Sequence, residues 1–361
     1  MFYSSEYRRR LKMRNIRWLL VAILALALPL MAHPIEQIHI RGQVGKPRIS
    51  EELKTIVVQV NYYGQQGVYP LKNAKVEIAK FKDGVATTLP DTLDLRNWTE
   101  FKIGEETWKI KGGYQLPGSS FGKWHTEEVS GFITLGHVKC DDMVGVSERQ
   151  YIWDNGNPAY AVSGSKNWPT KRIQLSDGSY AAELTTRKVV GVIASGNLFT
   201  GRVVRNMSLK QILGFTDKDG KALINWGVPF EARPRGFRVK FKYDGLGDSC
   251  TVMATLENRS QGNRRFVGVA WYSAKTDNDA SKEGVIRISP PDKNGLRALE
   301  TSFIYGRSHK NADPLPEGAV QGEADEPITH VNVVFASSRK GDYFKGVKDA
   351  RLIVQDFEFL Y

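Results

Sequence analysis

One short segment in the middle of the chain combines aromatic rings with clustered amides. It reads WDNGNPAY over residues 153–160, and a further tryptophan follows at Trp168. A flat ring can stack on the apolar face of a pyranose, and Asn side chains can both donate and accept hydrogen bonds with sugar hydroxyls. The same residues could instead form a tight Asn-Gly turn anchored by a buried tryptophan. The pattern therefore predicts either a sugar site at Trp153, Asn155, Asn157 and Trp168 or a loop anchored in the core.

A second segment, residues 179–201, adds charged and amide side chains. In its run YAAELTTR, the alternation of a strand puts Glu183 and Arg187 on the same face. That face could be a concave polar surface or simply the solvent side of the strand. The run ASGNLFTGR follows and contributes Asn197. Arg187 and Asn197 are therefore further candidates for hydrogen bonds to a sugar.

The chain ends in a strand that carries two acids, Asp356 and Glu358. Its apolar positions are expected to face the core: Ile353, Phe357, Phe359 and Tyr361. The two acids then project from the opposite face. Glycoside hydrolysis requires two carboxylates about 5 to 9 Å apart. Glu183 together with Asp356 or Glu358 is the candidate pair, serving as acid and base or nucleophile.

Metal chemistry has little support in the sequence. The six histidines are scattered, and no His-x-x-x-His or Cys-x-x-Cys spacing occurs. These spacings are the usual local signs of a zinc site. We therefore expect neither a metal nor another cofactor.

Short strands must position these residues, because the chain shows hardly any helical periodicity. Alternating or β-branched runs, such as TIVVQV at 55–60 and FRVKFKY at 237–243, are separated by clusters of Gly, Pro, Asn and Asp. This pattern is typical of all-β proteins. It predicts an immunoglobulin-like β-sandwich at residues 33–115 and, after a Gly- and Ser-rich linker at 116–125, a larger β-jelly-roll domain at 126–361.

The first 32 residues have the pattern of a secretory signal peptide. Six basic residues precede an apolar run from Trp18 to Ala32. At about 15 residues, this run is shorter than the roughly 20 that cross a bilayer as a helix, which favours cleavage near His33 over an uncleaved anchor. The remainder is expected to be periplasmic, at the cell surface or secreted, and no cysteine follows the signal to accept a lipid.

Two cysteines, Cys140 and Cys250, occur in the whole chain. In an oxidising compartment they could form a disulfide. They could equally be two buried thiols that behave as small hydrophobic residues. The sequence leaves both alternatives open.

The formal net charge is +12, and removal of the predicted signal leaves about +7. No basic run with interleaved aromatic residues remains, which argues against nucleic acid as a partner. The excess charge fits a solvated surface, or attraction to acidic glycans or to an anionic cell envelope.

Five segments of the second half, in this order, resemble the putative carbohydrate metabolism domain family of gut anaerobic bacteria: WDNGNPAYAVSG, DGSYAAELTTR, ASGNLFTGR, VVFASSRKGDYFKG and LIVQDFEFLY. In the first half, IEQIHIRGQVG followed by TIVVQV resembles the small sandwich that precedes the jelly roll in that family. The resemblance implies an exported protein with two β-domains and a role in carbohydrate metabolism. Many members look like lipoproteins, a feature that this sequence lacks.

The residues and the resemblance together predict an exported glycan-binding protein, with a glycan or oligosaccharide as its partner and a possible association with the cell envelope. Trp153 and Trp168 would stack on sugar rings, and four residues would donate or accept hydrogen bonds: Asn155, Asn157, Arg187 and Asn197. Two alternatives stay open. One is a glycoside hydrolase that uses a carboxylate pair, and the other is a non-catalytic structural or adhesive surface protein.

Overall fold

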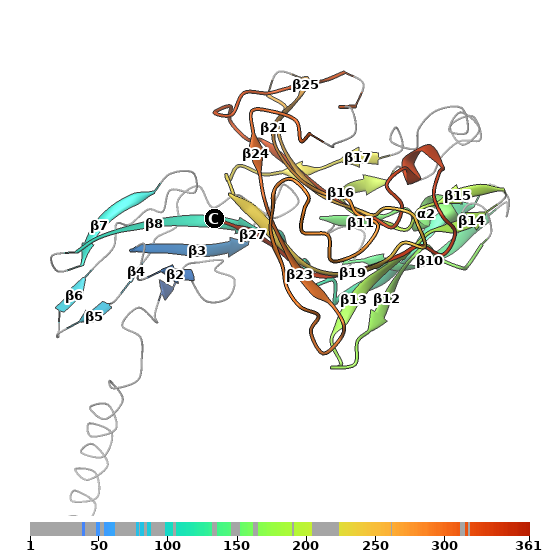
Figure 1. Cartoon of the computed structure of the whole chain (residues 1–361), viewed down its shortest axis with the longest axis horizontal. Helices are drawn as coiled ribbons and strands as arrows, with labels where there is room; N and C mark the ends of the chain where they lie inside the picture. Colours follow the sequence, from blue (N-terminus) through green and yellow to red (C-terminus); the bar gives the residue numbers. More distant parts are fainter. Residues whose placement is uncertain are drawn as a thin grey trace, which may run out of the picture.

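The computed structural model describes short stretches between residues 38 and 87 and most of residues 98–361; left out of the latter range are 104–105, 132–135, 146–151, 162–164, 190, 204–223, 261, 311–314 and 317. In this part of the chain nearly all regular structure is β (Figure 1). One short helix, α2 (Asn157–Ala161), and one 3-10 turn, η2 (Gly341–Tyr343), interrupt the described strands. The all-β prediction is confirmed.

Two sheets, antiparallel except for the pairing of β25, form the larger part of the described structure. The first has six strands in the order β12 (Thr170–Gln174), β13 (Tyr180–Thr185), β27 (Arg351–Leu360), β19 (Gly236–Asp244), β23 (Arg297–Ser302) and β22 (Val285–Ile288). The second has the order β11 (Trp153–Asn155), β16 (Asn197–Val203), β26 (His330–Ala336), β20 (Thr251–Asn258), β21 (Arg264–Tyr272) and β24 (Ile304–Tyr305), with β17 (Ile224–Trp226), β18 (Val228–Pro229) and β25 (Ala319–Gln321) paired at its margins.

The core lies between these two sheets. Strand alternation turns Phe237, Val239 and Phe241 of β19 inward, where they are fully buried. They belong to one apolar cluster with Val333 and Phe335 of β26 in the opposite sheet. This is the two-layer arrangement that the sequence predicted for the second domain.

The opposite face of the six-stranded sheet carries charged side chains along β19, and we call it the outer face. The residues that alternate with the buried positions of β19 are cationic: Arg238, Lys240 and Lys242. Because one face of the sheet is packed and the other is solvated, the outer face is where charged side chains can form a site.

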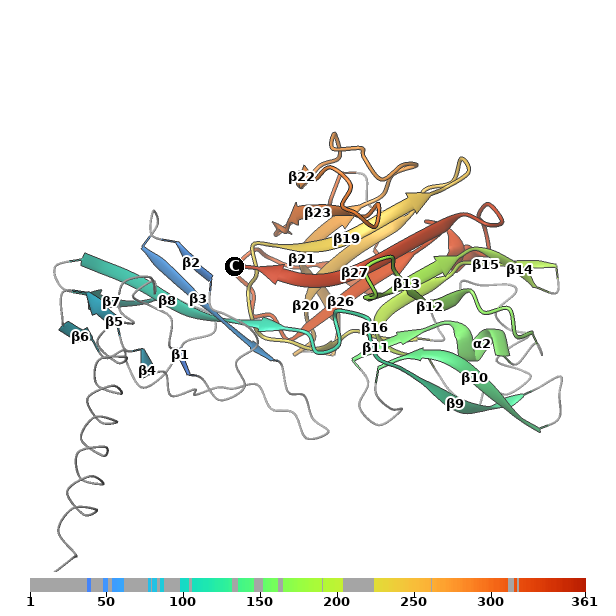
Figure 2. The same ribbon diagram turned by 90° about the horizontal axis from the view of Figure 1, so that it is seen from below.

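A smaller four-stranded sheet precedes the two large ones. Its order is β2 (Arg48–Ser50), β3 (Thr55–Asn61), β8 (Glu106–Gln115) and β7 (Thr99–Ile103), with β3 and β8 parallel. Figure 2 shows β8 running from this sheet toward the large sheets. Two strand pairs lie nearby in sequence, β1 (Ile38–His39) with β4 (Glu77–Ile78) and β5 (Lys80–Lys82) with β6 (Val85–Thr87). Most of residues 33–115, and the predicted signal at 1–32, lie outside the described residues, so the immunoglobulin-like sandwich and the signal stay predictions.

The residues after β8, predicted to be a linker, pack against the large sheets. Leu116 and Phe121 are buried in the main core. The side-chain amide of Gln115 exchanges two hydrogen bonds with the backbone of Phe359: Nε2 donates to the carbonyl at 2.9 Å, and Oε1 accepts from the N–H at 2.8 Å. The N–H of Phe357 donates to the carbonyl of Ser119 at 3.0 Å. The segment therefore takes the place of a neighbouring strand along β27 where β13 has ended.

Replacement of Gln115 by alanine is expected to lower the free energy of unfolding by about 1–3 kcal/mol. The change leaves a buried N–H and a buried carbonyl of Phe359 without their partners, which costs the desolvation of both groups. Urea titration followed by fluorescence measures the difference. Gln174→Ala, on the exposed side of β12, is the control and is expected to stay within about 0.5 kcal/mol. Equal effects of the two variants would contradict the role of Gln115.

The two cysteines lie in different clusters and form no disulfide. Cys140 is buried with its Sγ 3.5 Å from Sδ of Met143, and Cys250 is buried in the main core. Burial raises the pKa of the Cys250 thiol to about 12. Of the two alternatives left by the sequence, the buried thiols are the correct one. In the described part of the chain, no helix has the length and apolar character to cross a membrane.

Candidate functional site

The two tryptophans predicted to stack on a sugar are core residues. Trp153 is only 3% exposed and Trp168 only 4%. The ring of Trp153 packs edge-on against Phe121 at 5.0 Å and parallel to Phe335 at 6.1 Å, and its Nε1 donates to the carbonyl of Pro117 at 2.9 Å. Trp168 packs edge-on against Tyr160. A sugar has no access to either ring, so the stacking role is wrong and the alternative of a loop anchored in the core is correct.

The side-chain amides near these tryptophans form hydrogen bonds with backbone groups of the protein. Asn155 and Asn157 are fully buried. Nδ2 of Asn155 donates to the carbonyl of Asp142 at 2.9 Å, and that of Asn157 donates to the carbonyl of Thr170 at 2.8 Å. Oδ1 of Asn197 accepts from the N–H of Gly156 at 2.7 Å. The prediction that Asn155 and Asn157 bind sugar hydroxyls is therefore wrong, because their buried amides tie β10 (Gly136–Val144) and β12 to the segment that follows β11. Asn197 of β16 is partly exposed and holds the same segment through Gly156.

Arg187 and Glu183 lie apart from the acids of the last strand. Arg187, in β14 (Arg187–Val189), forms an ion pair with Asp349 at 3.0 Å. Glu183 lies on the outer face of the sheet, in the strand next to β27, but its carboxylate forms an ion pair with Arg351 at 3.3 Å. Neither lines the cavities described next, and the structure does not bring Glu183 together with Asp356 or Glu358 in one pocket.

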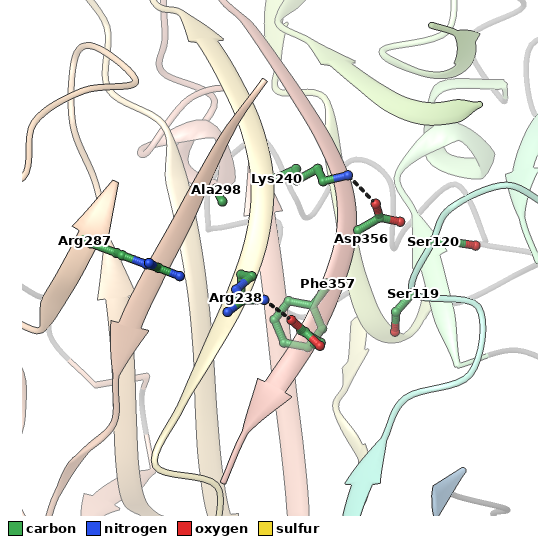
Figure 3. A pocket seen from close by; sticks show the side chains of 9 residues that line it. Ser119, Ser120, Arg238, Lys240, Arg287, Ala298, Asp356 and Phe357 are labelled. Atoms are coloured by element: carbon green, nitrogen blue, oxygen red, sulfur yellow. Dashed lines mark hydrogen bonds and ion pairs between the residues drawn. The ribbon is translucent and has the colours of Figure 1, made fainter. Parts of the chain in front are cut away.

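Asp356 and Glu358 do line an open cavity of about 480 Å³ on the outer face (Figure 3). Its lining is Ser119, Ser120, Arg238, Lys240, Arg287, Ala298, Asp356, Phe357 and Glu358. A second open cavity, of about 320 Å³, is lined by Ser120, Gly122, Asp177, Ser179, Tyr180, Lys240, Gln355 and Asp356. Three residues belong to both, so the cavities adjoin. We call the two adjoining cavities together the outer-face groove.

A β-bulge in β27 places Asp356 in the groove. Arg238 of β19 pairs with Glu358, whereas Lys240 pairs with Gln355, so β27 has one extra residue at this point. Asp356 has a φ of 53°, in the left-handed region that a non-glycine residue seldom adopts. Bulges of this kind redirect a side chain and are frequent beside functional sites.

The bulge also changes which residues of β27 face the core. Phe357 and Phe359 pack in the main core as predicted, and Asp356 and Glu358 project outward as predicted. Ile353 lies before the bulge and packs on the other side of the sheet with Ala181 and Leu296. The prediction that it shares the face of Phe357 is wrong, because the extra residue reverses the alternation.

Ion pairs connect the charged residues of the groove. Nζ of Lys240 lies 2.8 Å from Oδ2 of Asp356, and both side chains are about half exposed. Arg238 bridges Glu300 and Glu358, with its Nη1 at 2.9 Å from Glu358 Oε1, and Arg287 reaches Glu300 at 2.7 Å. The hydrogen bond to Asp356 raises the pKa of Lys240. Burial alone would raise the pKa of Glu300, but the hydrogen bonds from the two arginines outweigh it and hold the pKa below its ordinary value.

A partly exposed tyrosine, Tyr180, lines the second cavity. Tyr180 is 37% exposed, and the guanidinium of Arg172 lies 4.8 Å from its ring centre. Nε2 of Gln355 donates to Oγ of Ser179 at 3.0 Å, which fixes the hydroxyl and the amide side by side at the floor of the groove. The groove therefore combines an aromatic surface with hydroxyl, amide and charged groups.

Ser119, Ser120 and Gly122 form one wall of the groove and belong to the pattern GSSFG at 118–122. This spacing matches the serine-nucleophile elbow, which needs a strand-to-helix turn. Here the segment lies between two strands, β8 and β9 (Trp124–Gly131), so the context does not fit that chemistry. Among the described residues, no group of three or more His, Cys, Asp or Glu is arranged to hold a metal ion.

The sequence-based predictions missed most of the groove. Arg238 and Lys240 could have been found, because FRVKFKY alternates cationic and apolar residues and so marks an outward cationic row. Ser119, Ser120 and Tyr180 carried no local signal, because their meeting depends on long-range contacts between the predicted linker, β13 and β27.

Comparison with solved structures finds distant likenesses. One is named as a putative glycoside hydrolase from Bacteroides thetaiotaomicron, at 18% identity, covering 91% of this chain and 96% of that chain, with a TM-score of 0.46. Another is named as a putative glycoside hydrolase from Bacteroides vulgatus, at 17% identity, covering 74% and 96%, with a TM-score of 0.40. A third is a family 11 carbohydrate-binding module of a cellulosomal cellulase from Clostridium thermocellum, at 10% identity, covering 53% and 79%, with a TM-score of 0.24.

No protein of curated function matches the chain. A family model described as "Putative carbohydrate metabolism domain" matches residues 120–360, which is well over half of the chain and includes both large sheets. The resemblance inferred from the sequence is confirmed, and the chain belongs to the putative carbohydrate metabolism domain family.

Proposed function

We propose that the outer-face groove binds a glycan and that the protein does so without cleaving it. Membership of the family gives the chain a carbohydrate-related role. The observation that carries the proposal is the groove itself: an open cavity lined by the partly exposed Tyr180 together with the Lys240–Asp356 pair and Gln355. Sugars need this combination, since they present apolar ring faces and hydroxyls that both donate and accept.

Replacement of Tyr180 by alanine is expected to weaken glycan binding by about 1–2 kcal/mol, or roughly 5- to 30-fold, because a stacking ring is lost. Glycan-array screening followed by titration calorimetry of the full chain measures the loss. Tyr343→Ala is the matched control, because Tyr343 is a similarly exposed tyrosine in η2, outside the groove. Unchanged binding by both Tyr180→Ala and Lys240→Ala would place the glycan site elsewhere.

A glycoside hydrolase is the second candidate, because Asp356 and Glu358 line the same groove. Both are already bonded to cationic side chains, whereas a general acid must carry a proton to donate. This arrangement favours binding. A reducing-end assay on polysaccharides distinguishes the two functions: release of sugar that is lost in Asp356→Asn or Glu358→Gln, with binding retained, would establish hydrolysis.

A structural or adhesive role is the third alternative. Buried tryptophans without a polar concave surface would favour it. Trp153 and Trp168 are buried, but the outer-face groove supplies a polar concavity. This combination favours ligand binding over a spacer.

Export belongs to the same proposal. We expect the protein to act in the periplasm, at the cell surface or outside the cell, because its first 32 residues have the pattern of a signal peptide. Mass spectrometry of the mature protein tests this. A first residue near His33 would support export by a cleaved signal, and an intact N-terminus would contradict it.

A further inference from the structure

The outer-face groove has two ends that differ in chemistry. One end extends over β19, β23 and β22, where Arg238, Ala298 and Arg287 line it. The other extends toward the start of β13, where Ser179 and Tyr180 line it. Figure 3 shows Arg287, Arg238, Asp356 and Ser120 in a row that crosses the strands. The groove therefore runs across the sheet.

The two ends meet at three shared residues: Ser120, Lys240 and Asp356. The cavities measure about 480 and 320 Å³. Ligand pockets for whole small molecules commonly measure about 300–1,000 Å³, so each end alone has the size of a site for a small ligand. A ligand that fills both must extend past the Lys240–Asp356 pair in both directions.

The charges that line the groove balance. Three cations, Arg238, Lys240 and Arg287, face three carboxylates, Asp177, Asp356 and Glu358. The cations are already engaged: Lys240 with Asp356, Arg238 with Glu358 and Glu300, and Arg287 with Glu300. An anionic ligand would have to compete with these carboxylates for the same cations, at a cost in repulsion. A neutral ligand can instead form hydrogen bonds with the polar groups of the groove without displacing an ion pair.

We propose that the groove binds an internal stretch of a neutral, linear oligosaccharide, lying across the strands with the Lys240–Asp356 pair between two sugar subsites. This inference rests on the proposed function and adds to it the length and the charge class of the glycan. Tyr180 forms the stacking surface of one subsite, and Arg238 and Arg287 supply donors at the other.

Calorimetric titration of the full chain with size-graded oligosaccharides tests the proposal. The probes are cello-, xylo- and manno-oligosaccharides of one, two, four and six units, with oligogalacturonates of the same lengths as the anionic series. For a neutral series that binds, affinity is expected to rise at least tenfold from one to four units and then to level off. The anionic series is expected to bind at least tenfold more weakly at equal length.

Two variants assign the subsites. Tyr180→Ala removes the stacking surface at one end, and Ala298→Trp fills the cavity at the other; each is expected to abolish most of the gain from chain length. Arg287→Ala, a truncation at the exposed end of the groove, replaces Ala298→Trp if thermal unfolding shows that the tryptophan disturbs the fold. If oligosaccharides of one and four units bind with equal affinity, and this affinity depends on Tyr180, the proposal of an extended ligand is overturned while the proposal of glycan binding stands. A preference for oligogalacturonates would overturn neutrality, and no binding by any series would overturn the proposed function together with this inference.

Discussion

Trp153→Ala is expected to lower the free energy of unfolding by about 3–5 kcal/mol, the usual cost of removing a large aromatic side chain from a core. The ring contacts Phe121, Phe335 and Phe357, which come from the predicted linker and from both large sheets. Its removal opens a cavity where these elements meet. It also leaves the carbonyl of Pro117 without the hydrogen bond from Nε1.

Guanidinium titration followed by circular dichroism measures this loss. Trp98→Ala is the control, because Trp98 is 39% exposed, and its effect is expected to be below about 1 kcal/mol. The two interpretations of the sequence, a sugar site or a loop anchored in the core, predict opposite effects of this substitution on stability. A stable Trp153→Ala variant that fails to bind glycans would support the sugar site, whereas an unstable variant supports the core position that the structure shows.

Glu257→Gln is expected to destabilise the fold by about 3–5 kcal/mol, because it removes the buried counter-charge of two partly buried arginines. Glu257, in β20, is fully buried. Its carboxylate accepts from Nε of Arg259 at 2.8 Å and from Nε and Nη2 of Arg264 at 3.0 and 2.8 Å. Urea titration at pH 7 measures the loss. Glu128→Gln, on the exposed side of β9, is the matched control and is expected to change little.

The pH dependence of the same variant provides a second measurement. Burial would raise the pKa of Glu257, but the hydrogen bonds and charges of the two arginines outweigh it and lower the pKa. A carboxyl whose pKa is lower in the folded than in the unfolded state stabilises the fold above its ordinary pKa of about 4.5 and loses this contribution as the pH falls. The difference between wild type and Glu257→Gln should therefore narrow below pH 4.5. A difference that stays constant down to pH 3 would contradict the ion-pair explanation.

His330 also contributes to the pH dependence of the free energy of unfolding. It lies beside the same arginines, and burial together with their charge lowers its pKa to about 4. A histidine that stays neutral in the fold but is protonated in the unfolded chain destabilises the protein as the pH falls from about 6.5 to 4. Comparison of His330→Gln with the double variant His330→Gln, Glu257→Gln separates the two contributions.

The sequence predicted the fold class and the family correctly, and export remains a prediction. The all-β class followed from alternation and turn residues, and the family followed from five segments whose order matched it. Strand alternation also placed Glu358 outward and Phe357 and Phe359 inward, because these three residues follow the bulge at Asp356. The signal peptide is a local pattern and stays a prediction of the sequence alone.

The candidate site was predicted poorly, and Trp153 shows why. An aromatic residue beside asparagines has the same composition in a sugar site and in a buried turn, and only the contacts made by the ring distinguish them. Arg238 and Lys240 could be recognised as an outward row on β19, but their partners Glu300, Glu358 and Asp356 come from positions some 60 to 120 residues away.

The sequence by itself determined the local properties: which stretches are strands, which residues of a regular strand share a face, and the apolar segment at the N-terminus. These depend on neighbours within a few residues. Only the tertiary structure decided where the groove lies. One wall of the groove is the predicted linker, which Gln115 attaches to β27 by hydrogen bonds. The central acid, Asp356, projects from a bulge that strand alternation cannot reveal. Both features arise from pairing between segments distant in the chain, where hydrogen-bond partners and register are set by packing of the whole fold.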